Sequence, residues 1–484
     1  MSLFRKVSRF KSGPWRLFFI FNNIFKSIII RHLMDNYGGF GERKRALLTE
    51  FMSIDGAVVL GKTTSNLFRH RNVKAKRIDV KDFNHVLNID EKNLIADVEG
   101  MTTYEDLVEE TLRYGLMPTV VPQLKSITIG GAVSGGGIES SSFKYGLVHE
   151  TVEEMEILLG DGRIVVCTRV NRHKDLFYGF PNSYGTLGYV LRLKVRLVKV
   201  PSYVRLTHTR YTDAESYFDA VDSACKKYRK SKKLAFIDGS IFSEKEMYLT
   251  IGEGIDTAPY VSDYTYMNIY YRSIRKNQKD HTDYLTIKDY IWRWDTDWFW
   301  CSKNFGVQNK AIRFLVGKRF LRSTTYWKIR AWAARTRILE SINQLFGARK
   351  ESVIQDVEIP VQNAAEFLKF FQEEIGITPV WMCPTQPFSN GATYDLYTMR
   401  PKTLYINFGF WDAVKTGRED GYLNKKIESI VERLHGKKSL YSTSYYSEKK
   451  FRELYNGDAY DKLKRRYDAH KRFKTLYDKC VLRK

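Results

Sequence analysis

The chain has 484 residues, which is too long for a single hydrophobic core and predicts about two to four domains. A formal net charge of +24 favours an acidic partner, such as nucleic acid, acidic lipid or an acidic substrate, and leaves the fold open. The five cysteines are odd in number and contain no C-x-x-C pair, which argues against a disulfide framework and against a zinc site. A reducing, cytoplasmic setting is therefore expected.

Residues 1–45 predict a basic amphipathic arm. The first 50 residues carry ten Lys or Arg against three acids, and residues 17–30 form an apolar run of 14 residues, whereas a membrane-spanning helix needs about 20. Asn22, Asn23 and Lys26 interrupt the run, and no small-residue cleavage site follows it, which argues against a signal peptide. We interpret the arm as a helix lying in a membrane interface, with a helix packed on the protein's own surface as the alternative.

Residues 46–201 predict mainly β-structure. Apolar patterns indicate strands at residues 54–60, 85–99, 151–159, 163–168 and 189–200. Thr103 and Gly115 are typical of the start and the end of a helix between them. The turn Gly160-Asp161-Gly162 joins two of the strands, and Pro201 closes the last strand and marks the first expected domain boundary.

The chain from residue 202 to residue 440 predicts an antiparallel sheet backed by helices. Helices are expected at residues 213–229, 363–375 and 424–435, and strands at 234–242, 247–251, 355–360, 379–383 and 403–410. Residues 286–350, dense in Trp, Arg and Lys, are expected to be mostly helical, as is the basic tail at 441–484. The expected fold class is therefore α+β.

The segment from Gly56 to Thr63 matches the phosphate-loop expression G-x-x-x-x-G-K-[ST]. In a true phosphate loop the strand precedes the first glycine, and the intervening residues cradle the phosphate. Here the four intervening residues themselves predict a strand, and residues 45–52 before them predict a helix. Nucleotide triphosphatase activity is therefore not expected, although Gly61 to Asn66 still offers small donors to a diphosphate.

The strongest signal is the run of small residues from Pro122 to Ser142. Five glycines fall within the eight positions 130–137, and glycine lets the main chain approach a ligand closely. The Ser and Thr hydroxyls of the run suit a diphosphate or the edge of a ring. A second small-residue turn, Pro181 to Gly188, follows beyond the expected hairpin. The alternative interpretation is a pair of tight turns without a ligand.

These pieces carry a resemblance to a known family. Residues from about 56 to 200 resemble the FAD-binding domain of the vanillyl-alcohol-oxidase and p-cresol-methylhydroxylase (PCMH) superfamily, through the run from Thr128 to Ala132, the Gly160 hairpin and Gly185 to Gly188. The resemblance implies a two-part PCMH-type FAD-binding domain over residues 46–201. It also implies an antiparallel-sheet cap or substrate domain with helices over residues 202–440, followed by a basic helical segment over 441–484.

Within the superfamily, the segment from Gly137 to Gly146 resembles the Δ24-sterol reductase (Diminuto) branch, as do Val380 to Pro384 and Phe451 to Tyr460. Bacterial members of this branch include reductases that saturate a methylene group on a fatty acyl chain, of the methylene stearate type. The block from Tyr290 to Trp300 is more similar to those enzymes than to the sterol enzymes.

The resemblance also implies the residues that contact FAD. It implies a diphosphate site at Lys62, Thr63, Thr64, Ser65 and Asn66, and further contacts from Pro122, Ser126, Thr128, Gly130, Gly131, Ser134, Gly135, Gly136, Gly137, Ile138, Glu139, Ser140, Ser141, Ser142, Tyr145, Gly146 and Gly185. Many oxidases of the superfamily hold flavin covalently through a histidine at the position that aligns with Ile138. We therefore expect noncovalent FAD, which favours a reductase or dehydrogenase over a sugar oxidase.

Reduction of an isolated C=C bond needs a hydride and a proton, and the proton requires a positioned acid in a dry pocket. Asp295 and Asp297 lie among the tryptophans of residues 292–300, where burial would raise a carboxyl pKa. Tyr445 is a rival donor, together with Tyr446, Tyr405 and Glu139. The alternative is that one aspartate pairs with Arg293 and the tryptophans form ordinary core.

The function expected from the sequence is a membrane-attached FAD reductase of a lipid C=C bond. The substrate would be a methylene on a phospholipid-bound acyl chain, which a methyltransferase partner could supply, and NADPH would serve as a transient reductant. Residues 301–350, with twelve Lys or Arg and one acid, would dock anionic headgroups on the cytoplasmic, inner face of the membrane. Nucleic-acid binding is not expected, because no nucleic-acid module is present.

Three alternatives stay open at this point. Two keep the enzyme class: a Δ24-sterol-type reductase, and an oxidase or dehydrogenase of an alcohol or polyprenyl sugar. The third is a basic, membrane-binding scaffold without flavin.

Overall fold

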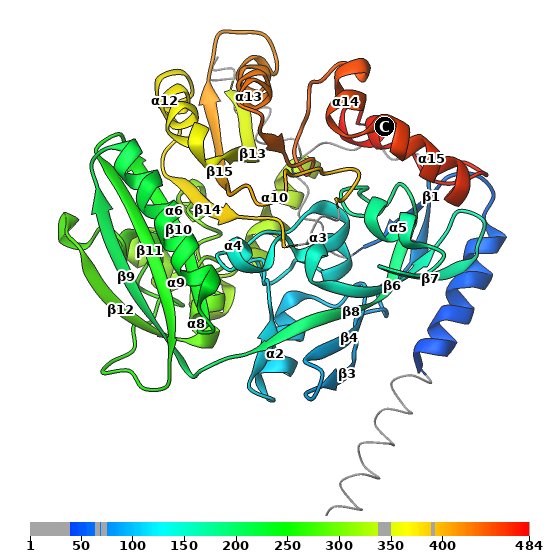
Figure 1. Ribbon diagram of the computed structural model, residues 1–484, viewed down its shortest axis with the longest axis horizontal. Coiled ribbons are helices and arrows are strands. Elements are labelled where there is room, and N and C mark those ends of the chain that lie inside the picture. Colours follow the sequence, from blue (N-terminus) through cyan, green and yellow to red (C-terminus); the bar gives the residue numbers. More distant parts are fainter. Residues whose placement is uncertain (1–38, 63–67, 69–74, 337–349, 389–392, 484) are drawn as a thin grey trace, which may run out of the picture.

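The computed structural model describes residues 39–62, 68, 75–336, 350–388 and 393–483. Two units lie side by side in Figure 1: a first unit made of residues up to about 200 together with residues 441–483, and a second unit made of residues 201–440. Most of the predicted N-terminal arm, including the apolar run at 17–30, lies outside the described residues. Residues 39–53 are helical and cross the expected boundary at residue 45. In the part of the chain that is described, every helix is too short or too polar to span a bilayer.

The first unit is built on an antiparallel sheet. In spatial order it contains β3 (Val86–Asp90), β4 (Ile95–Glu99), β8 (Tyr189–Lys199), β6 (Val152–Leu158) and β7 (Ile164–Thr168), with β5 (Leu116–Pro118) also paired to β8. Buried and less buried residues alternate along the second half of β8, as expected for a strand with one face on a core. The predicted hairpin at Gly160-Asp161-Gly162 is present, and Gly162 has a φ of +85°, which suits glycine.

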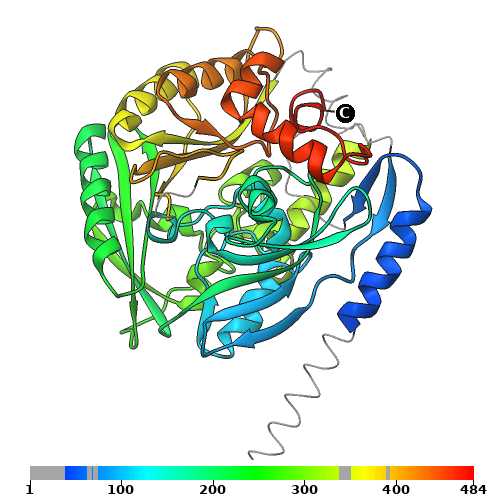
Figure 2. The same cartoon turned by 45° about the vertical axis from the view of Figure 1, so that its right-hand side comes forward.

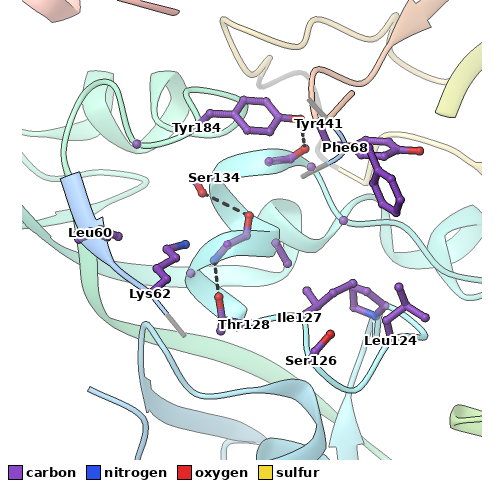
Figure 3. Close-up of a pocket in the computed structure, with 18 of the residues that line it drawn as sticks. Leu60, Lys62, Phe68, Leu124, Ser126, Ile127, Thr128, Ser134, Tyr184 and Tyr441 are labelled. Carbon is purple, nitrogen blue, oxygen red and sulfur yellow. Dashed lines mark hydrogen bonds between the residues drawn. The ribbon is translucent and has the colours of Figure 1, made fainter. Parts of the chain in front are cut away.

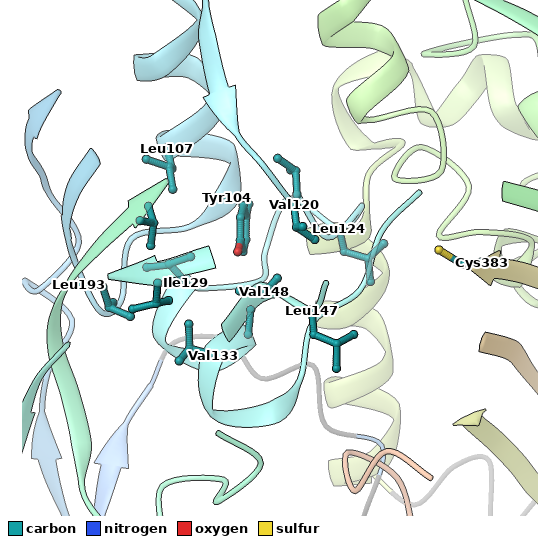
Figure 4. Close-up of a cluster of buried hydrophobic side chains, with 14 of the residues drawn as sticks. Tyr104, Leu107, Val120, Leu124, Ile129, Val133, Leu147, Val148, Leu193 and Cys383 are labelled. Atoms are coloured by element: carbon teal, nitrogen blue, oxygen red, sulfur yellow. The ribbon is translucent and has the colours of Figure 1, made fainter. Parts of the chain in front are cut away.

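Helix α2 (Tyr104–Leu112) packs its buried face on this sheet. The Thr103 side chain accepts a hydrogen bond from the Asp106 amide, and Gly115 beyond the end has a φ of +65°, so both predicted cap signals are confirmed. Figure 4 shows the core between α2, α3 (Ile129–Gly135) and β8, with Leu107, Ile129 and Leu193 packed together. Short helices α4 (Ser142–Tyr145), η1 (Val148–Thr151) and α5 (Lys174–Gly179) complete the unit.

A small parallel sheet of β1 (Val58–Gly61) and β2 (Lys76–Asp79) stands beside this core. Strand β1 occupies the positions that a phosphate loop would need as loop, and the described residues before it are helical. The dismissal of the phosphate-loop motif is therefore confirmed by the structure.

The second unit contains an eight-stranded antiparallel sheet. Its spatial order is β12 (His281–Thr286), β9 (Tyr203–Tyr211), β11 (Glu246–Ile255), β10 (Ala235–Ser243), β14 (Val380–Thr385), β15 (Tyr405–Lys415), β13 (Lys350–Pro360) and β16 (Lys437–Lys438). Helices α6 (Ala214–Lys230), α12 (Ala364–Glu374, after η5, Val361–Asn363) and α13 (Tyr422–Arg433) cover its outer face (Figure 1). The opposite face of the sheet lies toward the first unit (Figure 2), and Trp381 and Trp411 share a core with first-unit residues.

The expectation that residues 286–350 are mostly helical is only partly right. The described part holds α8 (Ile287–Ile291), η3 (Cys301–Phe305), α9 (Lys310–Val316), η4 (Lys318–Phe320) and α10 (Ser323–Thr336). Residues 292–300 form turns, and Trp298 and Phe299 adopt φ values of +46° and +59°. Left-handed backbone at two large residues is strained and is incompatible with a helix through residues 298–299. Strands β9 and β12, and the short α7 (Tyr270–Ser273) and η2 (Lys276–Gln278), had no predicted counterpart.

The C-terminal segment returns to the first unit. It forms α14 (Glu448–Leu454), α15 (Gly457–Tyr467) and α16 (Leu476–Cys480), drawn in red in Figure 1. The Lys464 ammonium donates to the Thr186 carbonyl at 2.7 Å, and the Val58 amide donates to the Arg472 carbonyl at 3.0 Å. The tail therefore belongs to the first unit rather than to an independent domain.

One buried guanidinium joins the two units. Arg293 Nη2 lies 3.2 Å from Glu139 Oε1 of the first unit and 2.7 Å from Asp238 Oδ2 on β10. All three side chains are almost fully buried. The Ile237 amide of the same strand donates to the Ser140 carbonyl at 2.8 Å. These bonds set the position of the second sheet relative to the segment that follows α3.

A second buried ion pair holds α9 on the protein. Arg313 forms a two-pronged bond with Asp297, at 2.6 Å and 2.9 Å, and both side chains are buried. Ser302 Oγ donates to the same carboxylate at 2.8 Å. Arg313 Nε also donates to the Tyr266 carbonyl, so a buried ion pair with further hydrogen bonds fixes the inner side of α9.

We predict that Arg313→Met destabilises the protein strongly, because it leaves the Asp297 carboxylate buried without its cation. Removing one partner of such a pair costs about 3–5 kcal/mol, whereas replacing both with apolar residues costs much less. Urea unfolding of Arg313→Met, of Arg313→Met with Asp297→Leu, and of the exposed control Arg319→Met measures this difference. Equal stability of Arg313→Met and the control would contradict the account.

Candidate active site

A cavity of about 1210 Å³ lies between the two units. This exceeds the range of roughly 300–1,000 Å³ that is usual for small-molecule pockets. Its wall combines three kinds of surface: bare main chain from α3, basic side chains, and aromatic side chains with one carboxyl.

The main-chain wall is formed by residues 130–137. The predicted loop is in fact the short helix α3, because the Thr128 side chain caps it by accepting from the Gly131 amide at 3.3 Å. Gly130 is required for packing, since a Cβ there would lie 2.7 Å from the Gly100 carbonyl oxygen. Gly136 ends the helix with a φ of +77°, and a Cβ on it would meet no atom within 4 Å. The open space beside Gly136 belongs to the cavity that it lines.

Basic side chains gather at one end of the cavity. Lys62 follows β1, Arg77 lies on β2, and Lys474 and Lys479 come from the C-terminal segment; all four line the cavity. Figure 3 shows Lys62 and Leu60 on one side of α3, with Tyr441 and Phe68 on the other. Positive charge at this end suits the diphosphate of a dinucleotide.

Gln123 is a buried polar side chain whose amide is not fully hydrogen-bonded. It lines the cavity and is 3% exposed, its amide oxygen has no partner among the described residues, and its amide nitrogen has only the Glu139 carboxyl within reach there. An unpaired buried amide is costly, typically about 1–3 kcal/mol. The side chain therefore fits a bound group that offers both a donor and an acceptor, as the edge of a flavin ring does.

The other end of the cavity is aromatic. Trp298 and Phe299 enter it from the strained turn, and Trp381 and Trp411 enter it from β14 and β15. The rings of Phe299 and Trp411 lie 4.5 Å apart, centroid to centroid, and those of Phe299 and Trp381 lie 5.5 Å apart. Phe68 and Trp327 close the same end. Such a chamber suits a flat or apolar ligand.

Asp356 on β13 is a carboxyl in the wall of this chamber. Asn407 Nδ2 donates to it at 2.9 Å, and the Tyr441 hydroxyl also hydrogen-bonds it. The opposite residue in the register is Gly409, where a Cβ would lie 2.7 Å from Asp356 Oδ1 and 2.6 Å from the Trp411 ring. Glycine at 409 therefore leaves room for the carboxyl between the rings.

Burial raises the pKa of Asp356 to about 6, although bonds from Asn407 and Tyr441 oppose the rise. The Asp356 side chain is partly accessible because it faces the cavity, and the surrounding rings keep that space poor in water. Trp411 Nε1 donates to the Tyr441 hydroxyl at 3.0 Å, and burial raises the pKa of Tyr441 as well. Near neutral pH, Asp356 and Tyr441 can therefore present a proton to the apolar end of the cavity.

The predicted cofactor residues fall into three groups. Those that line the cavity are Lys62, Pro122, Ser126, Thr128, Gly130, Gly131, Ser134, Gly135, Gly136, Gly137, Ile138 and Gly185. Thr63, Thr64, Ser65 and Asn66 lie outside the described residues. The third group is Glu139, Ser140, Ser141, Ser142, Tyr145 and Gly146, which the structure places away from the cavity lining.

The prediction for this third group needs correction. The Val148 amide donates to the Gly137 carbonyl at 2.9 Å, so the chain turns back just after Ile138. Glu139 then reaches Arg293, and Ser141 Oγ donates to the Thr119 carbonyl at 2.7 Å. In addition, the Gln386 amide donates to the Ser142 carbonyl at 3.3 Å. These residues join the two units, and that explains their small size and polarity without a ligand.

The predicted catalytic residues also lie outside the cavity lining. Asp295 accepts from the Lys125 amide at 2.9 Å and from Ser323, so it ties the cavity wall to α10, and burial raises its pKa. Asp297 is held by Arg313, while Arg293 pairs with neither aspartate. Tyr445 packs on Gly421 and Arg483. Their catalytic assignment is therefore replaced by structural roles, and Tyr446 and Tyr405 lie outside the lining too.

Sequence reasoning missed Gln123, Asp356, Trp411 and Tyr441. Gln123 belongs to the run of small residues from Pro122 to Ser142, but a single glutamine matches no sequence motif that would mark it as a ligand contact. Asp356 lies on a predicted strand that alternates polar and apolar residues, so it looked like a solvent-facing position. The second sheet instead turns that face toward the first unit. The pairing of β13 with β15 in the structure is needed to know that this face of the sheet is covered.

The residues present fit FAD. Lys62, Arg77, Lys474 and Lys479 would hold the diphosphate, the main chain at 130–137 would allow close approach, and Gln123 would satisfy its amide on the ring edge. Ile138 lines the cavity where the oxidases have a histidine, which suits noncovalent binding.

Comparison with known proteins identifies the class. The family described as "FAD binding domain" matches residues 56–168. The solved structure of 6-hydroxy-D-nicotine oxidase from Arthrobacter nicotinovorans superposes with a TM-score of 0.54 at 16% identity, covering 88% of this chain and 87% of that one. This likeness supports the PCMH-type fold, with its two-part flavin domain and sheet cap. The protein is an FAD-dependent oxidoreductase with a PCMH-type fold.

Relatives over most of the chain define the branch. The Δ24-sterol reductase of Mus musculus is 27% identical over 432 residues, covering 85% of this chain and 77% of the mouse protein. The Δ24-sterol reductase of Arabidopsis thaliana is 28% identical, covering 88% of this chain and 81% of the plant protein. Cytokinin dehydrogenase 7 of Oryza sativa subsp. japonica matches only 34% of this chain, at 26% identity. Over most of its length this chain is therefore similar to Δ24-sterol reductases.

We predict that Gly136→Leu abolishes FAD binding while the fold survives. A side chain at this position would enter the cavity and also adopt strained left-handed backbone, at a cost of roughly 1–2 kcal/mol. Gly115→Leu is the matched control, because Gly115 has a φ of +65°, meets no atom within 4 Å and does not line the cavity. Flavin released by acid precipitation should fall about tenfold or more in Gly136→Leu only. Equal flavin content in both variants would contradict the site.

We predict that Asp356→Asn changes the pH dependence of stability. The folded pKa of about 6 lies above the ordinary value of an aspartate, 3.8, so wild-type Asp356 contributes stability at low pH that is lost as pH rises through about 6. The asparagine does not titrate. The unfolding free energy of Asp356→Asn minus that of wild type should therefore rise by about 2 kcal/mol between about pH 4 and about pH 7. A difference that is constant with pH would show that Asp356 has an ordinary pKa.

Proposed function

We propose that this FAD-dependent oxidoreductase reduces a C=C bond of a lipid, with NADPH as the two-electron reductant. The single observation that carries the proposal is Asp356, a carboxyl with a pKa near neutrality, set in the aromatic end of the cavity beside Tyr441. An apolar chamber with one positioned acid is what reduction of an unactivated alkene requires.

The reaction adds one hydride to one alkene carbon and one proton to the other. Reduced flavin supplies the hydride when bound, and NADPH restores the two electrons as it becomes NADP⁺. The tryptophan rings bind the apolar substrate and exclude water, which strengthens the polar interactions inside the chamber. Asp356 holds the proton on its carboxyl, and the Tyr441 hydroxyl, oriented by Trp411 Nε1, keeps that carboxyl in place.

The relatives favour a sterol side chain as the substrate. The proteins that match most of this chain are Δ24-sterol reductases, so we place sterol-type reduction ahead of the methylene acyl chain expected from the Trp-rich block. The acyl chain is the second candidate, because that block contributes Trp298 and Phe299 to the cavity wall. A methyltransferase would then have to supply the methylene group.

We predict that Asp356→Asn lowers turnover by about 10²–10⁴-fold, which is the usual contribution of a positioned acid. FAD content should stay at the wild-type level. Wild-type turnover should fall as pH rises above about 6, because the Asp356 carboxyl then loses the proton that it would donate to the substrate. Asp412→Asn on the neighbouring β15 is the control, because Asp412 pairs with Lys303 and does not line the cavity.

Lipid mass spectrometry, with purified protein and NADPH under anaerobic conditions, measures this turnover. The substrates are a sterol with an unsaturated side chain, a methylene-bearing phospholipid and an alcohol or sugar. A gain of two hydrogens by the sterol supports the proposal. A gain of two hydrogens by the phospholipid alone supports the methylene acyl chain as the substrate instead. Oxidation of the alcohol or sugar without any lipid reduction would contradict it, as would full activity of Asp356→Asn.

A further inference from the structure

Five large apolar side chains on α9, η4 and α10 are exposed. Leu315 is 82% exposed, Phe314 68% and Phe320 55%, and Ile312 and Ile329 are each 41% exposed. These five residues lie within 18 consecutive positions of the chain. A soluble surface rarely gathers so many exposed large apolar groups in one short segment, and such patches mark sites of interaction. We call these five residues, together with the exposed Lys310, Lys318, Arg319 and Lys328, the docking face.

The apolar residues of this face are held outward by the packing beneath them. The two-pronged bond between Arg313 and Asp297 fixes the inner side of α9, and its neighbours Phe314 and Leu315 then project from the protein. Leu321 and Tyr326 fill the inward positions of the next segment. The exposure is therefore built into the fold.

The charge of the docking face is positive. No Asp or Glu occurs in the sequence between Asp297 and Glu340. Among the exposed cations of the face, Lys318 has an acidic neighbour at 3.6 Å, Asp263, which is itself exposed. Cations around exposed Phe and Leu match the interface of an anionic bilayer, where apolar groups enter the acyl boundary and Lys or Arg meet the headgroups.

The docking face also adjoins the cavity. Arg322, Thr324, Trp327 and Lys328, from the segment that follows η4, line the cavity. The Trp327 ring lies 5.5 Å from Phe68 and 5.8 Å from Trp298, centroid to centroid, at the aromatic end. A lipid that leaves a bilayer at this face would reach the aromatic chamber along α10.

We propose that the docking face inserts into the surface of an anionic lipid bilayer and places the aromatic end of the cavity next to it. Binding to the bilayer is independent of the proposed function. Only the direction in which substrate enters rests on that function, and the tests below read binding without turnover.

The first test places a fluorescent probe on the face. Leu315→Cys in the full chain is labelled with an environment-sensitive nitrobenzoxadiazole dye and mixed with vesicles of phosphatidylcholine and phosphatidylglycerol. Val170→Cys is the matched control, because Val170 is 88% exposed and shortly precedes α5 in the chain. Figure 1 labels α5 on the opposite side of the molecule from α9. Wild-type protein treated in the same way corrects for labelling of Cys301, which is partly exposed, since the other cysteines are buried.

The dye at position 315 should brighten about twofold or more and shift to the blue on vesicle addition, because it enters the apolar layer. The dye at position 170 should not change. A label at Leu315 reports on this face alone, whatever other segment of the full chain touches the vesicle. An unchanged dye at 315, with or without sedimentation of the protein with the vesicles, would overturn the proposal.

The second test reverses charge. Lys310→Glu with Arg319→Glu should weaken binding to anionic vesicles by about fivefold per residue at low salt. Lys92→Glu with Lys174→Glu is the control, since it makes the same change in net charge at two exposed positions of the first unit. Equal loss in both pairs would show that only the overall charge matters and would overturn the assignment to this face. Binding to a protein partner instead of vesicles would overturn it as well.

Discussion

The structure depends on one buried guanidinium that two carboxylates from different units share. Arg293 is buried, and within the described part of the chain Glu139 and Asp238 are its acidic partners. Charges buried in this way are tolerated only when their partners are in place, so the second sheet cannot move away from the segment after α3 without a large cost. The cavity exists because this joint holds the two units at a fixed separation just beyond Ile138.

The two walls of the cavity divide the chemistry between them. The first unit offers main chain without side chains and a basic end, which are features for holding a large charged cofactor. The second unit offers rings and the Asp356 carboxyl, which are features for an apolar substrate that must receive a proton. Asp295 and Asp297, placed around this site, support the wall through Ser323 and Arg313. A buried acid near a site is therefore not by itself a catalytic acid; the side chain must also face the open space.

Much of the fold was predictable from local pattern. Thr103 and Asp106 marked α2, the Gly160 turn marked the hairpin of β6 and β7, and the spacing of Phe367, Leu368 and Phe371 marked α12. The sequence did not predict those elements whose structure depends on contacts with residues far away in the chain. Strand β9 owes its pairing to β11 and β12, and the turn at Trp298 and Phe299 is held strained by the core around it. Neither leaves a local pattern that a single sequence can show.

The candidate site followed the same rule. The glycines between residues 130 and 137, predicted as FAD contacts, line the cavity, because close approach of the main chain needs glycine whatever the rest of the fold does. Asp356 and Tyr441 come from segments 85 residues apart in the sequence and meet only when β13 and the C-terminal segment are in place. The segment after Ile138 resembled its family closely, yet its residues serve the joint rather than the cavity.

The most direct measurement is an anaerobic absorbance titration of the purified protein. The account predicts a yellow protein whose flavin absorbance in the blue part of the spectrum is bleached by NADPH. One equivalent of a lipid with an isolated C=C bond should restore this absorbance for each equivalent of reduced flavin. A colourless protein that refuses added FAD, or a bound flavin that alcohols or sugars bleach and lipids never restore, would contradict it.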